Sequence, residues 1–296
     1  MFDTNPNLIQ DGLQRPGRQH DDEPMPLILI HDGGGTVYSY YLLEELGRAV
    51  FGIANPRFRT GVPWAGGLRE MATVYADVVA GAVSCGSVIL GGWSLGGLLA
   101  LETARVLSSA YPSVRVAGLV MIDSVCPVPP REGWGAAGAR VVERRIEWPA
   151  TTKPDTKIAV ERCFREAYKM VHEWARLAAD DAVAPRPPPA ILLRSREAVP
   201  VPQNDGNGNG NGNGNGNIDG NGLLYVDLYR HDRQLGWGNY CRDMFTCIYD
   251  IPGNHYSVFA LDHLETVSDA LKRACRDIDA MQLPSGIQAV ENPKVR

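Results

Sequence analysis

The sequence predicts an α/β fold in which helices flank a mostly parallel sheet. Short, continuously apolar runs alternate with longer segments of helical spacing through the first half of the chain. Continuous apolar runs are typical of strands buried on both faces, and their alternation with helices is the pattern of a parallel sheet. Hydrophobic residues make up 44% of the 296 residues, which is enough for a large buried core.

The first half of the chain contains the clearest elements. Residues 26–31 form an apolar run that ends in glycines, and residues 68–83 repeat apolar side chains at the intervals that one face of a helix requires. Residues 116–123 are apolar up to a terminal aspartate. The sequence therefore predicts strands over 26–31, 50–53, 88–90 and 116–123, and helices over 36–49, 68–83 and 95–111.

The alternation is interrupted over residues 126–189, where no strand is predicted. Proline clusters lie at both ends of this insertion, and a helix is expected over 157–179. An insertion of this size between two strands commonly forms a lid over an active site, and a helical excursion with no gating role is the alternative. Further strands are expected over 190–194 and 244–249, followed by a closing helix over 261–278.

Three segments are expected to lie outside the packed part of the domain, which we place at residues 26–278. Residues 1–25 are polar and acidic, so we predict a disordered or loosely attached leader. Residues 204–222 are dominated by an Asn-Gly repeat that cannot bury apolar surface, so we predict a flexible surface loop. Residues 279–296 are expected to form a C-terminal tail.

Charge and composition argue against several classes of function. The net charge of −5 and the lack of long basic runs disfavour nucleic-acid binding. The chain has no apolar stretch long enough to span a membrane, and its first residues lack the apolar core of a signal peptide. The six cysteines are scattered without a C-x-x-C pair, which indicates reduced thiols. We therefore expect a cytoplasmic protein.

The most informative motif is the pentapeptide Gly92-Trp93-Ser94-Leu95-Gly96, which lies between an expected strand and an expected helix. This G-x-S-x-G pattern is typical of a sharp turn that holds a nucleophilic serine in strained, exposed backbone. Glycines flank the serine because a Cβ there would collide with the neighbouring strand or helix. The alternative is an ordinary strand-to-helix connection with an incidental serine. The flanking elements favour Ser94 as a nucleophile.

A serine hydroxyl needs a base within hydrogen-bond distance, and histidine is suited to that role. Among the six histidines, His255 follows the last expected strand and a Pro-Gly-Asn turn, which places it at the carboxyl edge of the sheet. Ser94 is expected at the same edge, where parallel α/β sheets bind their ligands. His255 is therefore our candidate base.

Two carboxylates could orient that histidine. Asp123 ends the strand that follows the serine helix, and Glu197 follows the next strand. Asp123 directly adjoins an apolar strand and so has a rigid support, whereas Glu197 lies beyond an Arg-Ser-Arg sequence whose arginines could neutralise it. A carboxylate that merely caps a turn is the alternative for Asp123. The chain order serine, acid, histidine fits either carboxylate.

The developing oxyanion needs two N–H donors. One is expected to be the backbone of Leu95, the residue after the serine. The other is expected from the glycine loop after the first strand, in which Gly33, Gly34 and Gly35 allow close approach of the backbone to a ligand. A phosphate-binding turn is the rival interpretation, but the loop lacks the full G-x-G-x-x-G and Gly-Lys-Ser/Thr patterns.

These segments resemble the thioesterase domains that end polyketide synthases and non-ribosomal peptide synthetases, which have the α/β-hydrolase fold. The resemblance covers most of the chain, and it implies that the early carboxylate, Asp123, is the triad acid rather than Glu197. The Asn-Gly loop has no counterpart in the family. Four segments carry the resemblance, namely residues 26–35, 91–97, 119–124 and 251–259.

The resemblance implies release of an acyl, polyketide or peptidyl chain from the phosphopantetheine arm of a carrier protein, by water or by an internal nucleophile. No cofactor or metal is expected, and the expected partners are an acyl or peptidyl carrier protein and a small-molecule thioester. Aromatic residues of the insertion are our candidates for an apolar substrate chamber: Trp134, Trp148, Phe164, Tyr168 and Trp174, with Met170.

Two other functions remain open. A carboxylic-ester hydrolase of the esterase or lipase type would use the same three residues. A non-catalytic binding protein on this scaffold would need a gap in the triad, and the sequence shows none. Whether the chain acts as a free-standing enzyme or is a terminal domain of a synthase also stays open.

Overall fold

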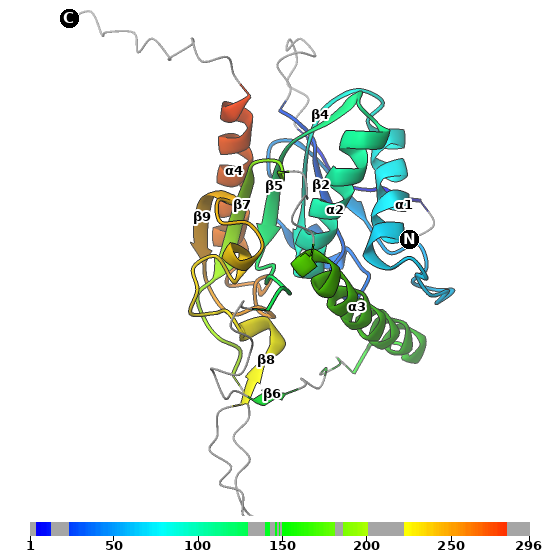
Figure 1. Ribbon diagram of the computed structural model, residues 1–296, viewed down its shortest axis with the longest axis vertical. Helices are drawn as coiled ribbons and strands as arrows, with labels where there is room; N and C mark the ends of the chain where they lie inside the picture. The colour runs from blue at the N-terminus through cyan, green and yellow to red at the C-terminus, as the bar shows by residue number, and fades with distance from the viewer. Residues whose placement is uncertain are drawn as a thin grey trace, which may run out of the picture.

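The computed structural model describes residues 4–12, 24–129, 140–142, 146, 148, 150–180, 186–200 and 222–282. Its centre is a seven-stranded sheet with the strand order β1-β3-β2-β4-β5-β7-β9 (Figure 1). All neighbouring strands in this sheet are parallel except β1, which pairs antiparallel with β3. The strands are β1 (Asn7–Asp11), β2 (Leu27–Ile30), β3 (Ala49–Ile53), β4 (Gly86–Trp93), β5 (Val114–Ile122), β7 (Ala190–Ser195) and β9 (Phe245–Ile251).

Helices cover both faces of the sheet, as the continuously apolar strands require. α1 (Gly67–Ala82) and α2 (Leu95–Ala110) pack together on one face, and α4 (Leu264–Met281) packs on the other (Figure 1). Side chains alternate between two cores along each strand: Ile28 and Ile30 belong to the core beneath α1 and α2, whereas Leu27 and Leu29 belong to the core beneath α4. The predicted mostly parallel α/β sheet is therefore confirmed.

Two expectations for the first 50 residues are wrong. The predicted helix over 36–49 is only a short 3-10 helix, η2 (Tyr38–Leu42), because Leu43 is extended and Gly47 has a positive φ of 71°. The leader expected over 1–25 contains β1, which covers the free edge of β3. The Asn5 side chain secures this segment through hydrogen bonds with both backbone groups of Ala54. Residues 13–23 of the leader lie outside the described residues.

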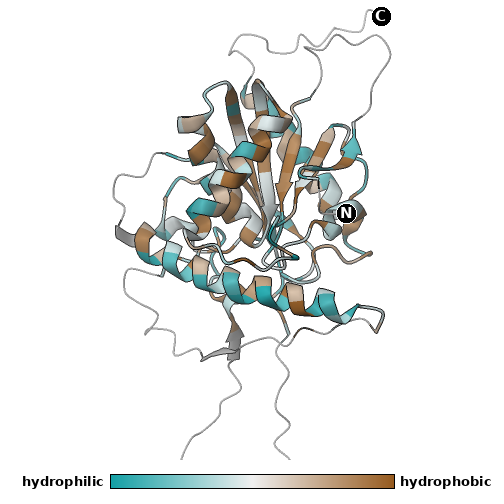
Figure 2. Cartoon of the chain, turned by 90° about the vertical axis from the view of Figure 1, so that its right-hand side faces the viewer, coloured by the Kyte–Doolittle hydropathy of each residue, from teal (hydrophilic) through white to brown (hydrophobic). Residues whose placement is uncertain are grey.

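The insertion between β5 and β7 contains a long helix, α3 (Pro154–Asp180), which lies across the carboxyl edge of the sheet (Figure 1). Figure 2 shows that its outward face is largely hydrophilic. The expectation that this insertion has no strand is wrong, because β6 (Arg140–Val142) pairs in parallel with β8 (Gly222–Leu224). This pair joins two distant parts of the chain that sequence periodicity could not connect.

The ends of the packed domain differ slightly from the prediction. α4 extends to Met281, so the closing helix reaches beyond residue 278. The Asn-Gly loop predicted over 204–222 lies outside the described residues apart from Gly222, and so does the tail beyond residue 282. All six cysteines are free thiols. Within the described part of the chain, no helix combines the length and apolar character needed to cross a membrane.

Candidate active site

Ser94 lies at the turn between β4 and α2, in strained backbone with a φ of 57° and a ψ of −118°. The turn is tight enough to require glycine on both sides. A Cβ on Gly92 would lie 2.6 Å from the Ile30 carbonyl oxygen, and one on Gly96 would lie 2.3 Å from the same atom. The sequence-level reason for the G-x-S-x-G pattern therefore applies to these two glycines.

Three side chains meet at the carboxyl edge of the sheet and form a hydrogen-bond relay. The His255 Nε2 atom lies 3.0 Å from the Ser94 Oγ, and its Nδ1 atom lies 2.9 Å from the Asp123 Oδ2. His255 is 2% exposed and Asp123 is fully buried, so water does not compete for the link between them. This arrangement can orient an imidazole to take a proton from a serine hydroxyl.

Backbone contacts position the members of the relay. Asp123 follows β5 directly, and its N–H donates to the Leu193 carbonyl of β7 at 2.7 Å. The His255 loop turns at Gly253, which has a φ of 73°, and the Asn254 Oδ1 atom accepts the Tyr256 N–H. Asp123 is thus held between the ends of β5 and β7, and His255 lies in the turn that follows β9.

Glu197, the alternative acid, does not join the relay. Its side chain is exposed, and its backbone N–H donates to the Gly253 carbonyl at 3.0 Å. The structure therefore places Asp123, and not Glu197, against His255.

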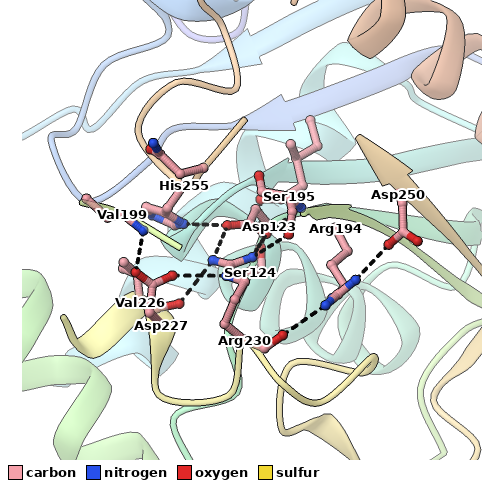
Figure 3. Close-up of polar contacts among 12 residues, drawn as sticks. Asp123, Ser124, Arg194, Ser195, Val199, Val226, Asp227, Arg230, Asp250 and His255 are labelled. Atoms are coloured by element: carbon pink, nitrogen blue, oxygen red, sulfur yellow. Dashed lines mark hydrogen bonds and ion pairs between the residues drawn. The ribbon is translucent and has the colours of Figure 1, made fainter. Parts of the chain in front are cut away.

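Sequence reasoning missed the arginine that contacts the Asp123 carboxylate. Arg230 donates from both terminal nitrogens to the two Asp123 oxygens, at 2.7 and 2.9 Å, and from Nε to Asp227 (Figure 3). The Ser195 N–H also donates to Asp123. Burial alone would raise the pKa of Asp123, but the hydrogen bonds from His255 and Arg230 lower it to about 2. The only sequence signal was an Asp-x-x-Arg spacing after the Asn-Gly repeat.

The glycine loop lies beside the serine with two of its N–H groups already used. The Gly34 N–H donates to the Asp32 side chain at 3.1 Å, and the Gly35 N–H donates to the Asp32 carbonyl at 3.0 Å. No acceptor contacts the Gly33 N–H within the described part of the chain. Leu95 begins α2, so its N–H has no partner inside the helix. Among the four candidate donors, Gly33 and Leu95 therefore keep an N–H group that is not already used within the described residues.

Two ionisable residues of that loop have unusual environments. Burial raises the pKa of the Asp32 carboxyl from 3.8 to about 6, despite the hydrogen bond from Gly34. Burial also lowers the pKa of His31 to about 4. The His31 ring lies 2.5 Å from the Tyr75 hydroxyl and 2.5 Å from the Asp32 carbonyl, so it supports the loop rather than the serine.

Trp93 is a second residue whose contact with the site was missed. Its indole N–H donates to the His255 carbonyl at 3.1 Å, and the two rings lie 5.6 Å apart between centroids. The indole also forms a T-shaped contact with the Phe259 ring, at 5.4 Å between centroids. Trp93, the residue between Gly92 and Ser94 in the G-x-S-x-G pattern, therefore supports the histidine loop.

The insertion residues proposed for a substrate chamber separate into different environments. Phe164, 36% exposed, lies over the glycine loop, where a Cβ on Gly33 would approach its ring to 2.9 Å. Tyr168 is 58% exposed and its ring packs against His172 and Tyr225. These residues fit an exposed aromatic surface near the site.

Two of the remaining candidates, Trp174 and Met170, are buried in the core. Trp174 is buried against Trp237 and Tyr240, and Met170 lies in the same core, so both anchor α3. Trp148 donates to the exposed Glu161 side chain. Trp134 lies outside the described residues. For Trp174 and Met170 the substrate-contact expectation is therefore wrong, because the helix buries the face that carries them.

The parallel sheet, the serine turn and the Ser94–His255–Asp123 relay define the class of proteins with the α/β-hydrolase fold. Solved structures with this fold are similar to the chain. They include the NocB thioesterase domain from the nocardicin cluster (TM-score 0.54, 23% identity, 86% of this chain and 95% of that one). They also include YbtT, a type II thioesterase from the yersiniabactin NRPS/PKS pathway (TM-score 0.56, 14% identity, 92% and 98%).

The chain belongs to the thioesterase family. The family model described as "Thioesterase domain" matches residues 25–275. A relative from Glarea lozoyensis, named "Probable thioesterase gloN", is 33% identical over an alignment that covers 93% of this chain and 98% of the relative. The resemblance on which the sequence analysis relied is thereby confirmed, and the family is one of hydrolases.

Proposed function

We propose that this chain is a serine thioesterase that releases an acyl, polyketide or peptidyl chain from the phosphopantetheine thioester of a carrier protein. The observation that carries the proposal is the continuous relay from Ser94 Oγ through the His255 ring to Asp123. In a catalytically silent binding protein nothing would require both links at hydrogen-bond distance.

In the first half of the proposed reaction, the Ser94 oxygen attacks the thioester carbonyl carbon while His255 Nε2 takes the hydroxyl proton. In this proposal the N–H groups of Leu95 and Gly33 donate to the oxyanion that forms. As the tetrahedral intermediate collapses, the carbon–sulfur bond breaks and His255 returns the proton to the departing thiol. The acyl chain is then an ester on Ser94.

In the second half, water or a nucleophile within the acyl chain attacks the ester. His255 again accepts a proton and delivers it to the Ser94 oxygen as the ester bond breaks. Asp123 stays ionised throughout because its pKa is about 2, so it stabilises the positive imidazole without taking its proton. The proposed chemistry needs no cofactor.

The surroundings of the site support a substrate with a long apolar part. Phe164 and Tyr168 project from α3 with 36% and 58% of their surfaces exposed, on the helix that crosses the carboxyl edge. Contacts remote from the reacting carbonyl can be used to position it. YbtT is a type II thioesterase from an NRPS/PKS pathway, and this likeness supports a carrier-bound substrate here.

Active-site labelling tests the proposed nucleophile. A fluorophosphonate should label the wild-type protein once, and Ser94→Ala should not label and should lose on the order of a million-fold in kcat. Ser124→Ala is the matched control, because Ser124 is buried at the same edge of the sheet but outside the relay. Labelling that persists in Ser94→Ala, or disappears in Ser124→Ala, would contradict the proposal.

Substrate comparison separates the thioesterase from an ester hydrolase with the same residues. Long-chain phosphopantetheine thioesters should have a much higher kcat/KM than short p-nitrophenyl esters, despite the better leaving group of the latter. Intact mass spectrometry of the acylated protein would identify the chain that accumulates on Ser94. If short esters react as fast as every thioester, the carboxylic-ester hydrolase becomes the better assignment.

A further inference from the structure

An arginine bound to both oxygens of the carboxylate in the relay is chemically unexpected, because its positive charge opposes the task of that carboxylate. Asp123 must favour a positive charge on His255 during the proposed reaction. A guanidinium at 2.7 and 2.9 Å from its oxygens offsets the negative charge that does so. Something must therefore balance Arg230 if the arginine is to hold the acid without weakening it.

Asp227 supplies that balance. Its Oδ1 accepts the Arg230 Nε–H at 2.9 Å, and its Oδ2 accepts the Val199 N–H at 2.8 Å. Asp227 is 2% exposed and Arg230 is 8% exposed, so solvent screens their charges weakly. The negative charge of Asp227 and the positive charge of Arg230 cancel, which leaves the cluster with one net negative charge beside His255.

The arginine is also held rigidly. Its terminal nitrogens donate to the backbone carbonyls of Ser195 and Val226, at 2.9 and 3.2 Å, in addition to the Asp123 carboxylate (Figure 3). The Arg230 carbonyl accepts a hydrogen bond from Arg194, whose own charge is paired with Asp250. All three guanidinium nitrogens therefore have acceptors in fixed positions, which gives the Asp123 carboxylate a single orientation.

We infer that Arg230 and Asp227 are a positioning pair for the triad acid: Arg230 fixes the Asp123 carboxylate, and Asp227 restores the negative field that Arg230 would otherwise remove. This inference rests on the proposed serine mechanism. It extends the relay by two residues that the chain supplies from the segment between β8 and β9.

The pair should control the pH at which activity falls on the acid side, because the proposed base works only as the neutral imidazole. Among the described residues, Asp123 and Asp32, in the loop after β2, interact electrostatically with His255, and Arg230 and Asp227 are joined to Asp123 by hydrogen bonds. Removing the positive charge of Arg230 favours protonation of the imidazole, and removing the negative charge of Asp227 disfavours it. The two single substitutions should therefore have opposite effects.

The experiment is a pH profile of kcat/KM for the full-length protein. Arg230→Gln should move the acid limb to higher pH by about one unit, and Asp227→Asn should move it to lower pH by a smaller amount. The double variant should fall between them, because it removes both charges. Arg230→Lys should keep the limb near that of the wild type while kcat falls about tenfold, because a lysine cannot bind both carboxylate oxygens.

Arg48→Gln is the matched control. Arg48 is 4% exposed and pairs with Asp279 through both terminal nitrogens, next to β3 at the opposite edge of the sheet. This variant should lower the melting temperature without moving the limb. Repeating the profiles in an Asp32→Asn background removes the titration of that carboxyl from the comparison.

The outcomes separate this inference from the proposed function. Activity that survives Ser94→Ala would overturn the serine mechanism. An inactive Ser94→Ala, together with Arg230 and Asp227 variants whose limbs stay at the wild-type pH or move in the same direction, would overturn only the role of the pair. If Arg230→Gln does not fold, Asp227→Asn and Arg230→Lys still give opposite expectations, a shifted limb and an unshifted one.

Discussion

The Trp93 indole N–H donates to the backbone carbonyl of His255, so the residue that precedes the candidate nucleophile holds the loop of the candidate base. The two loops are far apart in sequence and meet only in the folded chain. The Trp93 ring also packs on His255 and Phe259. Any movement of the serine turn is thereby coupled to the position of the imidazole.

Trp93→Phe tests this coupling, because it keeps an aromatic ring and removes the N–H donor. The loss of one partly buried hydrogen bond of about 1 kcal/mol should lower kcat by about fivefold. Trp148→Phe is the control, since the Trp148 N–H contacts only the exposed Glu161 side chain. Steady-state kinetics are the measurement, and equal effects of the two substitutions would contradict the coupling.

Asp123→Asn and Glu197→Gln distinguish the two carboxylates. Asp123→Asn should lower kcat by up to about 10⁴, because the amide no longer holds the histidine in the required tautomer. Glu197→Gln should leave turnover near that of the wild type, because its side chain is exposed and outside the relay. Kinetics and circular dichroism of both variants check this, and the reverse ranking would show that the later carboxylate acts in solution.

Asp32 should make the protein less stable as the pH rises. Its folded-state pKa of about 6 exceeds the ordinary value of 3.8, so the native state binds the proton more tightly than the unfolded state. The free energy of unfolding should therefore fall between about pH 4 and pH 6. Asp32→Asn should be more stable than the wild type at pH 8, with a difference that shrinks at pH 4.

Asp123 should have the opposite effect in the acid range. Its folded-state pKa of about 2 lies below 3.8, so stability is lost as the pH falls from about 4 towards 2. Urea unfolding at several pH values measures the contributions of both Asp32 and Asp123.

An Asp32→Asn variant that is less stable than the wild type at pH 8 would contradict the Asp32 prediction, because it would show that the Asp32 carboxylate is better solvated than its burial indicates.

Substitutions in α3 should separate anchoring from substrate contact. Trp174→Ala removes a buried indole that packs 5.4 Å from the Tyr240 ring, and should reduce the free energy of unfolding by about 3–5 kcal/mol. Tyr168→Ala removes a side chain that is 58% exposed, so stability should change little while KM for long-chain thioesters rises. Thermal unfolding and kinetics measure the two effects, and a similar loss of stability in both variants would argue against this division.

The central sheet, Ser94 and His255 could be predicted because their signals are local, whereas the choice of Asp123 over Glu197 came from the family resemblance. Continuous apolar runs mark the buried strands, and the glycines around Ser94 follow from backbone clashes with Ile30. Asp123 and His255 each follow a strand, so a parallel sheet brings them to one edge.

The errors arose where tertiary contacts overrode local pattern. Trp174 and Tyr168 look alike in sequence, but only one faces the core. β1 is a polar edge strand whose pairing with β3 depends on the sheet being present. Arg230 could not be assigned to Asp123 because 107 residues separate them and charge alone does not identify a partner.

The backbone of Ser94 has a further consequence, which concerns what the fold gives up to present a hydroxyl. A φ of 57° with a ψ of −118° is unfavourable for any residue with a Cβ, at roughly 1–3 kcal/mol. Glycine would relieve it, so Ser94→Gly should melt at a higher temperature than both the wild type and Ser94→Ala, which keeps the Cβ. Folding and reactivity thus make opposing demands at this position, and an inactive chain would be the more durable one.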